Sequence, residues 1–291
     1  ILKLRFRLVN HPMPLQNFHS ISGGVIGLDY SPDGKKCNLK ILPDSEKEIS
    51  TIHTNLLVVA DGATSFCRHI LGVSWGIKNY CQRAVLANFK SSLSPNIARQ
   101  WFRRDEVLAF LPTAKNSLSM IWSQRDCDAQ RLLQEGDSYL MKELSNFIGT
   151  TMLSRIEIDS KMISAPLAMT TVDKLVTKRV VLLGDSAHTV HPLAGLGLNI
   201  GLFDILTLVN EFDKAINKNR KFDAGCESIL SSYLRARLLK TRAIQTLIDT
   251  IKVGFSVGGY SAKLLRTRGM NLLDRSDLLK QYIVRFAASV L

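Results

Sequence analysis

The chain has no long hydrophobic run and no paired cysteines. None of its 291 residues belongs to an apolar stretch approaching the roughly 18–20 residues of a membrane-spanning helix. Its 5 cysteines are odd in number, scattered and never spaced as C-x-x-C, which argues against a disulfide framework and a zinc site. No signal peptide is evident. These absences predict a cytoplasmic protein without spanning helices.

An initiator methionine is also absent. Ile1 opens directly into alternating apolar and basic residues up to Leu8, a pattern typical of a strand inside a sheet. We therefore expect the sequence to be a fragment that starts within a fold. With 291 residues and 46% hydrophobic content, it predicts one large domain or two closely joined domains with a sizeable core.

The most informative stretch is residues 180–204, which begins as a strand and ends as a helix. Val180–Leu183 is an apolar run rich in branched residues, which predicts a buried strand. Gly184 and Asp185 end this strand, and from Leu198 apolar residues recur at helical spacing. The turn between them contains residues that allow close backbone approach: Pro192, Gly195 and Gly197.

This order of elements suits a phosphate-bearing, hydroxyl-rich cofactor. The first N–H groups of the helix have no intrahelical partner, and with the helix dipole they attract an anion. The carboxylate of Asp185 can accept hydrogen bonds from a sugar-like chain.

The stretch resembles the second flavin-binding motif of the class A flavoprotein monooxygenases, G-D-A-A-H-x-x-x-P-x-x-G-x-G-x-N. It stands here as Gly184-Asp185-Ser186-Ala187-His188, then Pro192, Gly195, Gly197 and Asn199. His188, His191 and the Leu-Ala pair after the proline resemble the branch that hydroxylates ubiquinone precursors. An ordinary buried strand, turn and helix is the alternative interpretation.

A second motif follows an apolar run at Leu56–Ala60, which predicts another buried strand. Asp61-Gly62, Ser65 and Arg68 resemble the family pattern A-D-G-x-x-S-x-x-R. The resemblance implies that the Asp-Gly turn lies near the flavin pyrophosphate and is linked to NAD(P)H use. An aspartate at a strand end with an arginine one turn later is expected to make an anion-friendly, self-neutralised corner. The alternative is a purely structural Asp-Gly turn capped by Ser65.

The resemblance implies an α/β fold with α+β character. A partial Rossmann-like FAD-binding domain (residues 1–72 and 150–215) would interleave with a β-sheet substrate domain (73–149), followed by a basic helical region (216–291). The cofactor-binding residues implied by the two motifs are Asp61, Gly62, Gly184, Asp185, Pro192, Gly195, Leu196, Gly197, Leu198 and Asn199. No side chain is nominated as catalytic.

By resemblance, the intact protein would be an aromatic hydroxylase using FAD and NAD(P)H on a polyprenyl phenol or quinol. The family's first signature, G-x-G-x-x-G, is absent, since the glycine clusters at 23–27 and 195–201 have the wrong spacing. The chain therefore matches only the later two-thirds or so of a family member. We expect this fragment to retain FAD weakly or not at all.

One position departs from the quinone branch: Leu196 stands where glutamine is common. This change threatens substrate handling more than flavin geometry. A second function therefore stays open, a flavin-free scaffolding subunit of a quinone-biosynthesis complex. The missing signature and Leu196 favour it, while the intact Asp185, Gly195 and Asn199 oppose it. The gene sequence upstream of Ile1 would discriminate the two functions.

The remaining patterns predict further elements, and none of them identifies the substrate pocket. Strands are expected at Val25–Tyr30, Cys37–Ile41, Val85–Phe89, Val107–Leu111, Ser117–Trp122, Met152–Ile158 and Ile163–Met169. Helices are expected at 128–148, 198–212 and 227–252, the last with Leu234, Leu238, Leu247, Ile248 and Ile251 on one face. Candidates for the pocket wall are Trp101, Phe110, Leu111 and Trp122.

Positive charge is concentrated near the end of the chain. Residues 231–291 hold eleven Lys or Arg against three acidic residues, most of the net charge of +13. This predicts either a peripheral contact with an anionic membrane surface or a solvated charged face. No nucleic-acid-binding module is present. Contacts with other ubiquinone-biosynthesis proteins and oligomer formation both remain open.

Two further chemistries are excluded by spacing. His188 and His191 could face one metal ion, but no third ligand with suitable spacing is evident, so no metal site is expected. A hydrolase built on Ser186 lacks the G-x-S-x-G elbow.

Overall fold

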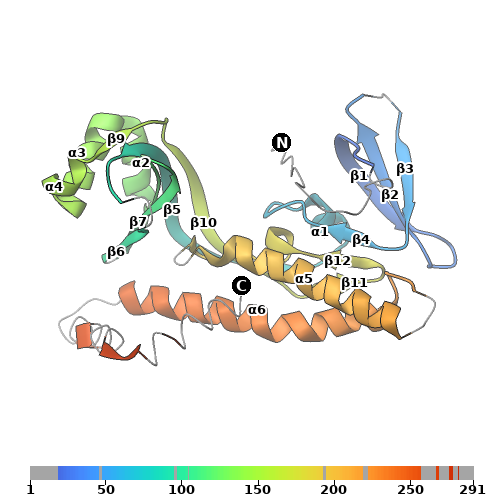
Figure 1. Ribbon diagram of the computed structural model, residues 1–291. Coiled ribbons are helices and arrows are strands. Elements are labelled where there is room, and N and C mark those ends of the chain that lie inside the picture. Colours follow the sequence, from blue (N-terminus) through green and yellow to red (C-terminus); the bar gives the residue numbers. More distant parts are fainter. Residues whose placement is uncertain are drawn as a thin grey trace. The chain divides into compact units, whose positions relative to one another are not determined.

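The computed structural model describes residues 19–45, 48–94, 97–103, 105–192, 195–218 and 222–256, with isolated residues at 267–268, 275–277 and 281. The strand expected over the first eight residues lies outside this part of the chain. The fold divides into two compact units, Ile1–Thr54 and Asn55–Leu291 (Figure 1).

The first unit is a three-stranded antiparallel meander. Its strands, in the order β1-β2-β3, are β1 (Gly23–Tyr30), β2 (Cys37–Pro43) and β3 (Ser50–Thr54). Tyr30 pairs with Cys37 across the turn, and Gly34 takes the left-handed φ of +65° that the turn requires. The strands expected at Val25–Tyr30 and Cys37–Ile41 are therefore confirmed, and they form a hairpin.

A small sheet in the second unit brings the two sequence motifs together. Its strands, in the order β11-β12-β4, are β11 (Val176–Thr177), β12 (Val180–Leu182) and β4 (Leu57–Val59). Because β12 runs parallel to β4, the turns that follow these two strands leave the sheet at the same edge. Both strand predictions are confirmed.

A larger antiparallel sheet carries the rest of the strands. Its order is β10-β5-β8-β7-β6, with β9 pairing to β5. The strands are β5 (Trp75–Ser91), β6 (Arg99–Arg103), β7 (Glu106–Ala114), β8 (Ser117–Arg125), β9 (Ile156–Ile158) and β10 (Ile163–Val172). Helices α2 (Asp126–Glu135), α3 (Asp137–Ile148) and α4 (Thr150–Leu153) lie against one face (Figure 1). Alternate strand residues and the inner face of α3 form the core, including Val85, Phe89, Leu108, Leu140 and Leu144.

Three expectations in this region are corrected. The single helix over 128–148 is two helices, because Gly136 at φ 81° and ψ −163° takes a conformation essentially reserved for glycine. The strand expected over Met152–Ile158 is helical at Thr150–Leu153 and extended only at Ile156–Ile158. Strand β6 was not anticipated, because charged and aromatic residues obscure its alternation.

Two long helices pack side by side on the small sheet (Figure 1). Helix α5 (Leu196–Asn217) begins two residues earlier than expected, and α6 (Glu227–Ser256) spans the predicted 227–252. No helix in the described part of the chain combines the length and apolarity needed to cross a bilayer.

The prediction of which α6 residues face inward is wrong: the buried positions are shifted by about one residue from the predicted ones. Leu247 and Ile251 are exposed, and of the predicted set only Ile248 is fully buried. The face that packs inward instead mixes apolar with polar residues: Tyr233, Arg237, Thr241, Ile244, Gln245 and Ile248. Apolar periodicity alone could not predict this face, because three of its buried residues are polar: Arg237, Thr241 and Gln245.

Helix α5 keeps an apolar stripe that the described residues leave uncovered. Leu198 is 72% exposed, and the other members of the stripe are Leu202, Ile205, Leu206 and Val209. Strand β4 pairs only with β12 among the described strands, so its other edge is open. Monomeric proteins seldom expose such contiguous apolar surface without a partner for it.

Candidate cofactor site

The turn after β12 is held by backbone geometry and one buried carboxylate. Gly184 takes a φ of +58° at the start of the short 3₁₀ turn Gly184–Ser186, and its N–H donates to Asp204 on α5 at 2.9 Å. A Cβ on Gly201 would lie 3.3 Å from the Cα of Gly184. Glycine at 201 thus lets α5 approach the turn closely.

The start of α5 offers unpartnered backbone N–H groups. Gly195 is the N-cap in the left-handed conformation (φ 62°, ψ 18°), and no side chain in the described part of the chain caps the helix. Its N–H is held by the carbonyl of Pro192 at 3.3 Å, and added atoms at Gly195 would meet open space. The first N–H groups of α5, beginning at Leu196, are therefore free to bind an anion.

Two polar side chains of this motif, Asp185 and Asn199, have no partner among the described residues. Asp185 is exposed, and its carboxylate makes no hydrogen bond to a described residue. Asn199, half-buried in the first turn of α5, likewise has no side-chain partner among them. An acceptor carboxylate and a donor amide beside open N–H groups match the chemistry of a hydroxyl-rich phosphate chain.

The departure at Leu196 has a packing explanation. Its side chain packs against a buried cluster of Ile200 on α5 with Ile244 and Ile248 on α6. An amide at this position would lose that apolar contact. Leu196 therefore stabilises the helix pair, while its backbone still belongs to the open turn.

The second motif forms a capped turn at the same edge of the sheet. Asp61 accepts the N–H of Cys67 at 3.0 Å, and Ser65 accepts the N–H of Arg68 at 3.0 Å, so both cap α1 (Phe66–Ile70). Gly62 has a φ of +88° and open space around it. This capping is the structural role weighed above for Ser65, and it leaves Asp61 exposed at the strand end.

Arg68 does not form the expected anion-binding corner. Its side chain is only 3% exposed, and it donates to the carbonyls of Ser186 and Ala63 at 2.8 Å each. Burial lowers the pKa of Arg68, although the nearby Asp61 opposes this shift. Ser186 adds hydrogen bonds from its hydroxyl to the carbonyls of Val59 and Leu183 at 2.8 Å each. Arg68 and Ser186 thus lock the two motif turns to each other.

A buried ionic cluster that the sequence analysis missed supports this turn. Asp204, 1% exposed, binds Arg237 of α6 at 2.7 Å and His188 Nε2 at 2.8 Å, besides the N–H of Gly184. Arg237 also donates to the carbonyl of Ile200 at 3.2 Å. The sequence contained a signal for this cluster, because an aspartate within the largely apolar segment Ile200–Leu208 needs a buried partner.

The two histidines of the motif have separate partners. His188 contacts Asp204, whereas His191 Nε2 lies 3.1 Å from the side-chain oxygen of Gln82. No group of three or more His, Cys, Asp or Glu in the described part of the chain could hold a metal ion.

His191 predicts a pH dependence of stability. Burial, aided by the charge of Lys252, lowers the pKa of His191 to about 4, against about 6.5 in an unfolded chain. Below pH 6.5 the unfolded chain therefore takes up a proton that the folded chain does not. The stability contributed by neutral His191 is fully present above about pH 7.5 and is lost as the pH drops, by about 2 kcal/mol between about pH 7.5 and 5.

Urea unfolding across this range checks the prediction. The variant His191→Asn should lose about 2 kcal/mol less of its free energy of unfolding than the wild type between about pH 7.5 and 5. The exposed His19 supplies the matched control, and His19→Asn should keep the wild-type dependence. If the free energy of unfolding fell equally with decreasing pH in all three proteins, a neutral, buried His191 would be contradicted.

The larger sheet divides the candidate pocket residues between its two faces. Phe110 and Trp122 lie in the core beneath α2 and α3, with Trp101 packed against them, so none of the three lines an open pocket. Leu111 alternates to the opposite face, which is not covered by those helices. The half-buried apolar residues on this second face include Leu86, Ala109, Leu111 and Ile121.

Comparison with known proteins supplies the deciding observation. The sequence profile of the FAD-binding domain family matches residues 28–246, three-quarters of the chain. The chain belongs to this family.

Relatives of this FAD-binding domain protein include the ubiquinone biosynthesis monooxygenase COQ6 of Schizosaccharomyces pombe. They are 29% identical over 276 residues, covering 81% of this chain and 57% of that protein. The 3-demethoxyubiquinol 3-hydroxylase of Escherichia coli is 27% identical, covering 92% of this chain and 66% of that protein. The chain thus spans about 57% of the length of its first relatives. The resemblance to the ubiquinone-hydroxylase branch is confirmed.

The fold comparison agrees. The p-nitrophenol 4-monooxygenase PnpA of Pseudomonas putida superposes with a TM-score of 0.74 at 14% identity, covering 91% of this chain and 66% of that one. This likeness confirms the mixed α/β fold.

The residues present fit part of FAD. The open amides of α5 and the free carboxylate of Asp185 suit its ribityl-phosphate region. No described turn carries the G-x-G-x-x-G spacing that suits the adenosine diphosphate end.

Proposed function

We propose that this chain is the flavin-cradling and substrate-facing part of an FAD- and NAD(P)H-dependent aromatic hydroxylase. Its substrate would be a polyprenyl phenol or quinol of ubiquinone biosynthesis, in keeping with the names of its relatives. The observation that carries the proposal is the pair of motif turns held at one sheet edge by Arg68, Ser186 and the parallel pairing of β4 with β12. That edge is where α/β sheets bind nucleotides.

The proposed cofactor residues fall into two groups. The turn after β12 and the start of α5 would hold the ribityl chain, phosphate and ring edge through Gly184, Asp185, Pro192, Gly195, Leu196, Gly197, Leu198 and Asn199. Asp61 and Gly62, at the end of β4, would lie beside the pyrophosphate. Leu196 and Leu198 contribute backbone N–H groups, since one side chain packs inward and the other is exposed.

The chemistry would belong to the cofactor and the positioning to the chain. A flavin held by the amides of α5 and by Asp185 would supply the oxygen-transfer chemistry for an electron-rich ring. The open amides and Asp185 orient the flavin by binding its phosphate and hydroxyl groups. Leu86, Leu111 and Ile121 give the uncovered sheet face an apolar wall that suits a ring and excludes water.

The uncovered parts of the α/β unit support the fragment interpretation. A further strand could pair with the open edge of β4, and a further helix could cover the apolar stripe of α5. We propose that the intact protein carries such a strand and helix, including the adenosine-binding turn that the described residues lack. The domain boundaries at residues 72, 149 and 215 are part of this proposal.

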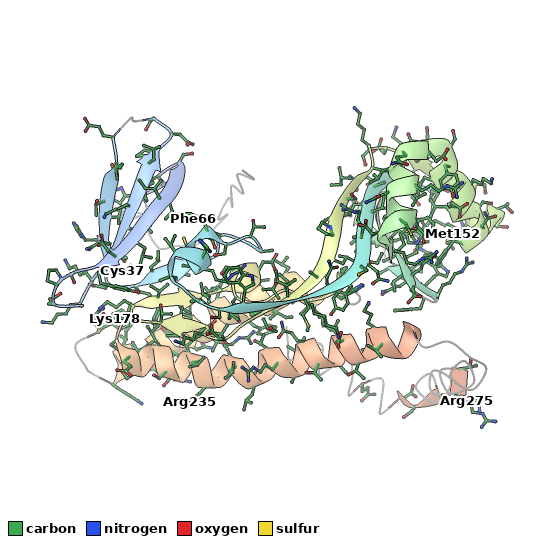
Figure 2. All side chains as sticks on the ribbon, turned by 180° about the vertical axis from the view of Figure 1, so that it is seen from behind. Cys37, Phe66, Met152, Lys178, Arg235 and Arg275 are labelled. Carbon is green, nitrogen blue, oxygen red and sulfur yellow. The ribbon has the colours of Figure 1, made fainter. Side chains whose placement is uncertain are left out.

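We also propose that the protein is cytoplasmic and that α6 contacts a membrane surface peripherally. Exposed basic residues such as Arg235 project outward from the helix (Figure 2), and Leu239 beside them is 75% exposed. Cations mixed with exposed leucine suit an anionic lipid surface, where a polyprenyl substrate resides. A solvated charged face remains the alternative for these residues. Contacts with other ubiquinone-biosynthesis proteins are compatible with either.

Flavin content of the intact protein tests the proposed function. The protein encoded by the full gene should purify with stoichiometric FAD and oxidise NAD(P)H in the presence of a polyprenyl phenol. Asp185→Ala should weaken FAD binding by about 10–100-fold, because hydrogen bonds to a charged group contribute about 1.5–3 kcal/mol.

Asp213→Ala is the matched control, since Asp213 is exposed on the same helix as the open amides and has no partner among the described residues. It should retain full flavin content. An intact protein without flavin would overturn the hydroxylase and favour the scaffolding subunit.

A further inference from the structure

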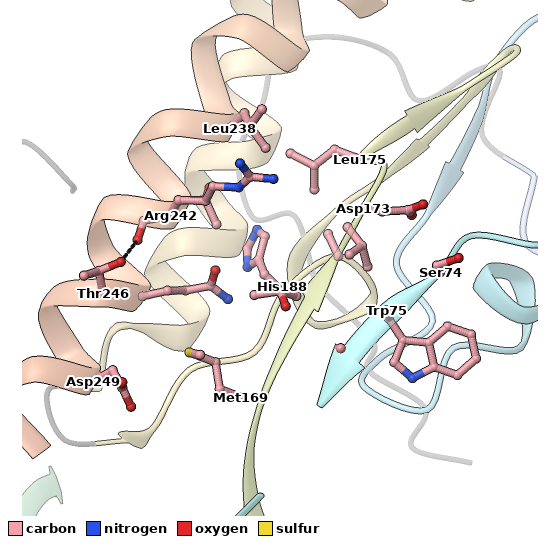
Figure 3. Close-up of a pocket in the computed structure, with 16 residues that line it drawn as sticks. Ser74, Trp75, Met169, Asp173, Leu175, His188, Leu238, Arg242, Thr246 and Asp249 are labelled. Carbon is pink, nitrogen blue, oxygen red and sulfur yellow. Dashed lines mark hydrogen bonds between the residues drawn. The ribbon is translucent and has the colours of Figure 1, made fainter. Parts of the chain in front are cut away.

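A cavity of about 560 Å³ lies between α6 and the strand ends around Trp75 and Val172 (Figure 3). Its wall combines apolar side chains with a few polar groups from α6. The apolar members include Trp75, Met169, Leu175 and Leu238. None of the ten residues proposed to bind FAD lines it, so the cavity is separate from the cofactor site.

Two polar groups of this cavity lack partners. Thr241 is only 4% exposed, and its hydroxyl forms no hydrogen bond with a described residue. A buried hydroxyl without a partner is unfavourable unless a ligand or water supplies one. Arg242, the next residue, has no acidic partner in the described part of the chain, and its guanidinium extends from α6 across the cavity (Figure 3).

The acidic residues of the wall do not neutralise Arg242. Asp249 is committed to Lys78 at 2.6 Å and to the hydroxyl of Tyr80 at 3.2 Å. The carboxylate of Asp173 points away from α6 (Figure 3). His188 reaches the cavity, but its Nε2 is held by Asp204. One cation and one hydroxyl therefore stand unpaired over an apolar wall.

We propose that this cavity binds an amphipathic monocarboxylate. The carboxylate would pair with Arg242 and accept a hydrogen bond from Thr241, while the apolar body packs against Trp75, Leu175 and Leu238. The volume lies within the range of roughly 300–1,000 Å³ typical of small-molecule sites. A polyphosphate fits poorly because Arg242 is the one unpaired cation among the described residues of the wall, and Arg242 would repel a cationic ligand.

Titration with decanoate tests this site, using the fluorescence of Trp75 and the thermal unfolding midpoint of the chain. Decanoate should bind saturably and raise the midpoint, and the fluorescence change should vanish in Trp75→Phe. Decan-1-ol, which has the same body without the charge, should bind about tenfold more weakly, as expected from the loss of one charge-assisted hydrogen bond.

Three variants distinguish this cavity from other apolar surfaces. Arg242→Gln should weaken decanoate binding about tenfold, and Thr241→Val should weaken it several-fold without lowering the unfolding midpoint. Leu238→Trp should fill the cavity and abolish binding. Arg235→Gln, an exposed change on the same helix, should leave binding unchanged.

Absence of saturable binding, or binding that Arg242→Gln and Leu238→Trp both leave intact, would overturn the proposal. Neither readout requires flavin, so the result is independent of the proposed hydroxylase activity.

Discussion

Replacing Asp204 with asparagine is expected to lower the free energy of unfolding by about 3–5 kcal/mol. The carboxylate is 1% exposed and binds Arg237, His188 and the N–H of Gly184. An uncharged amide would leave the guanidinium of Arg237 buried without a counter-charge, which costs more than the pair itself contributes. Urea unfolding followed by circular dichroism measures the difference.

Asp213→Asn is the matched control because Asp213 lies exposed on the same helix. Its free energy of unfolding should stay within about 0.5 kcal/mol of the wild type. Removing both charges in Asp204→Leu with Arg237→Met should cost less than the sum of the two single changes, since no unpaired charge is left. A loss below about 1 kcal/mol for Asp204→Asn would show that the cluster does not hold α6 against the turn after β12.

Gly225→Ala is expected to destabilise the protein by about 3 kcal/mol. A Cβ at Gly225 would lie 1.9 Å from the carbonyl oxygen of Asn55 and 2.7 Å from a guanidinium nitrogen of Arg179. Arg179 forms two hydrogen bonds to Asp223, at 2.9 and 2.8 Å, and a third to Asn55. The added methyl group would displace Arg179 and Asn55 and break these hydrogen bonds, which hold the segment before α6 beside β4.

Gly254→Ala provides the contrasting control in α6, where an added Cβ meets no atom within 4 Å. Alanine favours helix over glycine by up to about 1 kcal/mol, so this change should leave stability unchanged or raise it. The thermal unfolding midpoint distinguishes the two variants. Equal midpoints for Gly225→Ala and the wild type would contradict the close approach at Asn55.

The local patterns predicted most strands and both long helices, because their periodicity depends on near neighbours in the chain. The errors lie where a single backbone conformation or a distant partner decides. Gly136 divides one apolar pattern into two helices through a conformation that the pattern does not reveal. The inner face of α6 contains Arg237, Thr241 and Gln245, whose burial is possible only because other elements supply partners or a cavity.

The candidate cofactor site shows the same division. The glycines, Asp185 and the order of strand, turn and helix are readable along the chain, since they act through backbone N–H groups and local turns. Arg68 was misassigned because an arginine near an aspartate suggests an ion pair, whereas the carbonyls of Ser186 and Ala63 are its partners. Those carbonyls come from two different turns, and only folding brings them together.

The sequence alone determined the two motif turns, the strands that precede them and the resemblance to the ubiquinone-hydroxylase branch. Each of these follows from residues close together in the chain. Only the tertiary structure decided that Arg68 and Ser186 connect the two turns, that Asp204 connects the turn after β12 to α6, and that Thr241 and Arg242 line a separate cavity. These depend on contacts between residues that are distant in sequence, and burial gives such contacts their energetic weight by removing competing water.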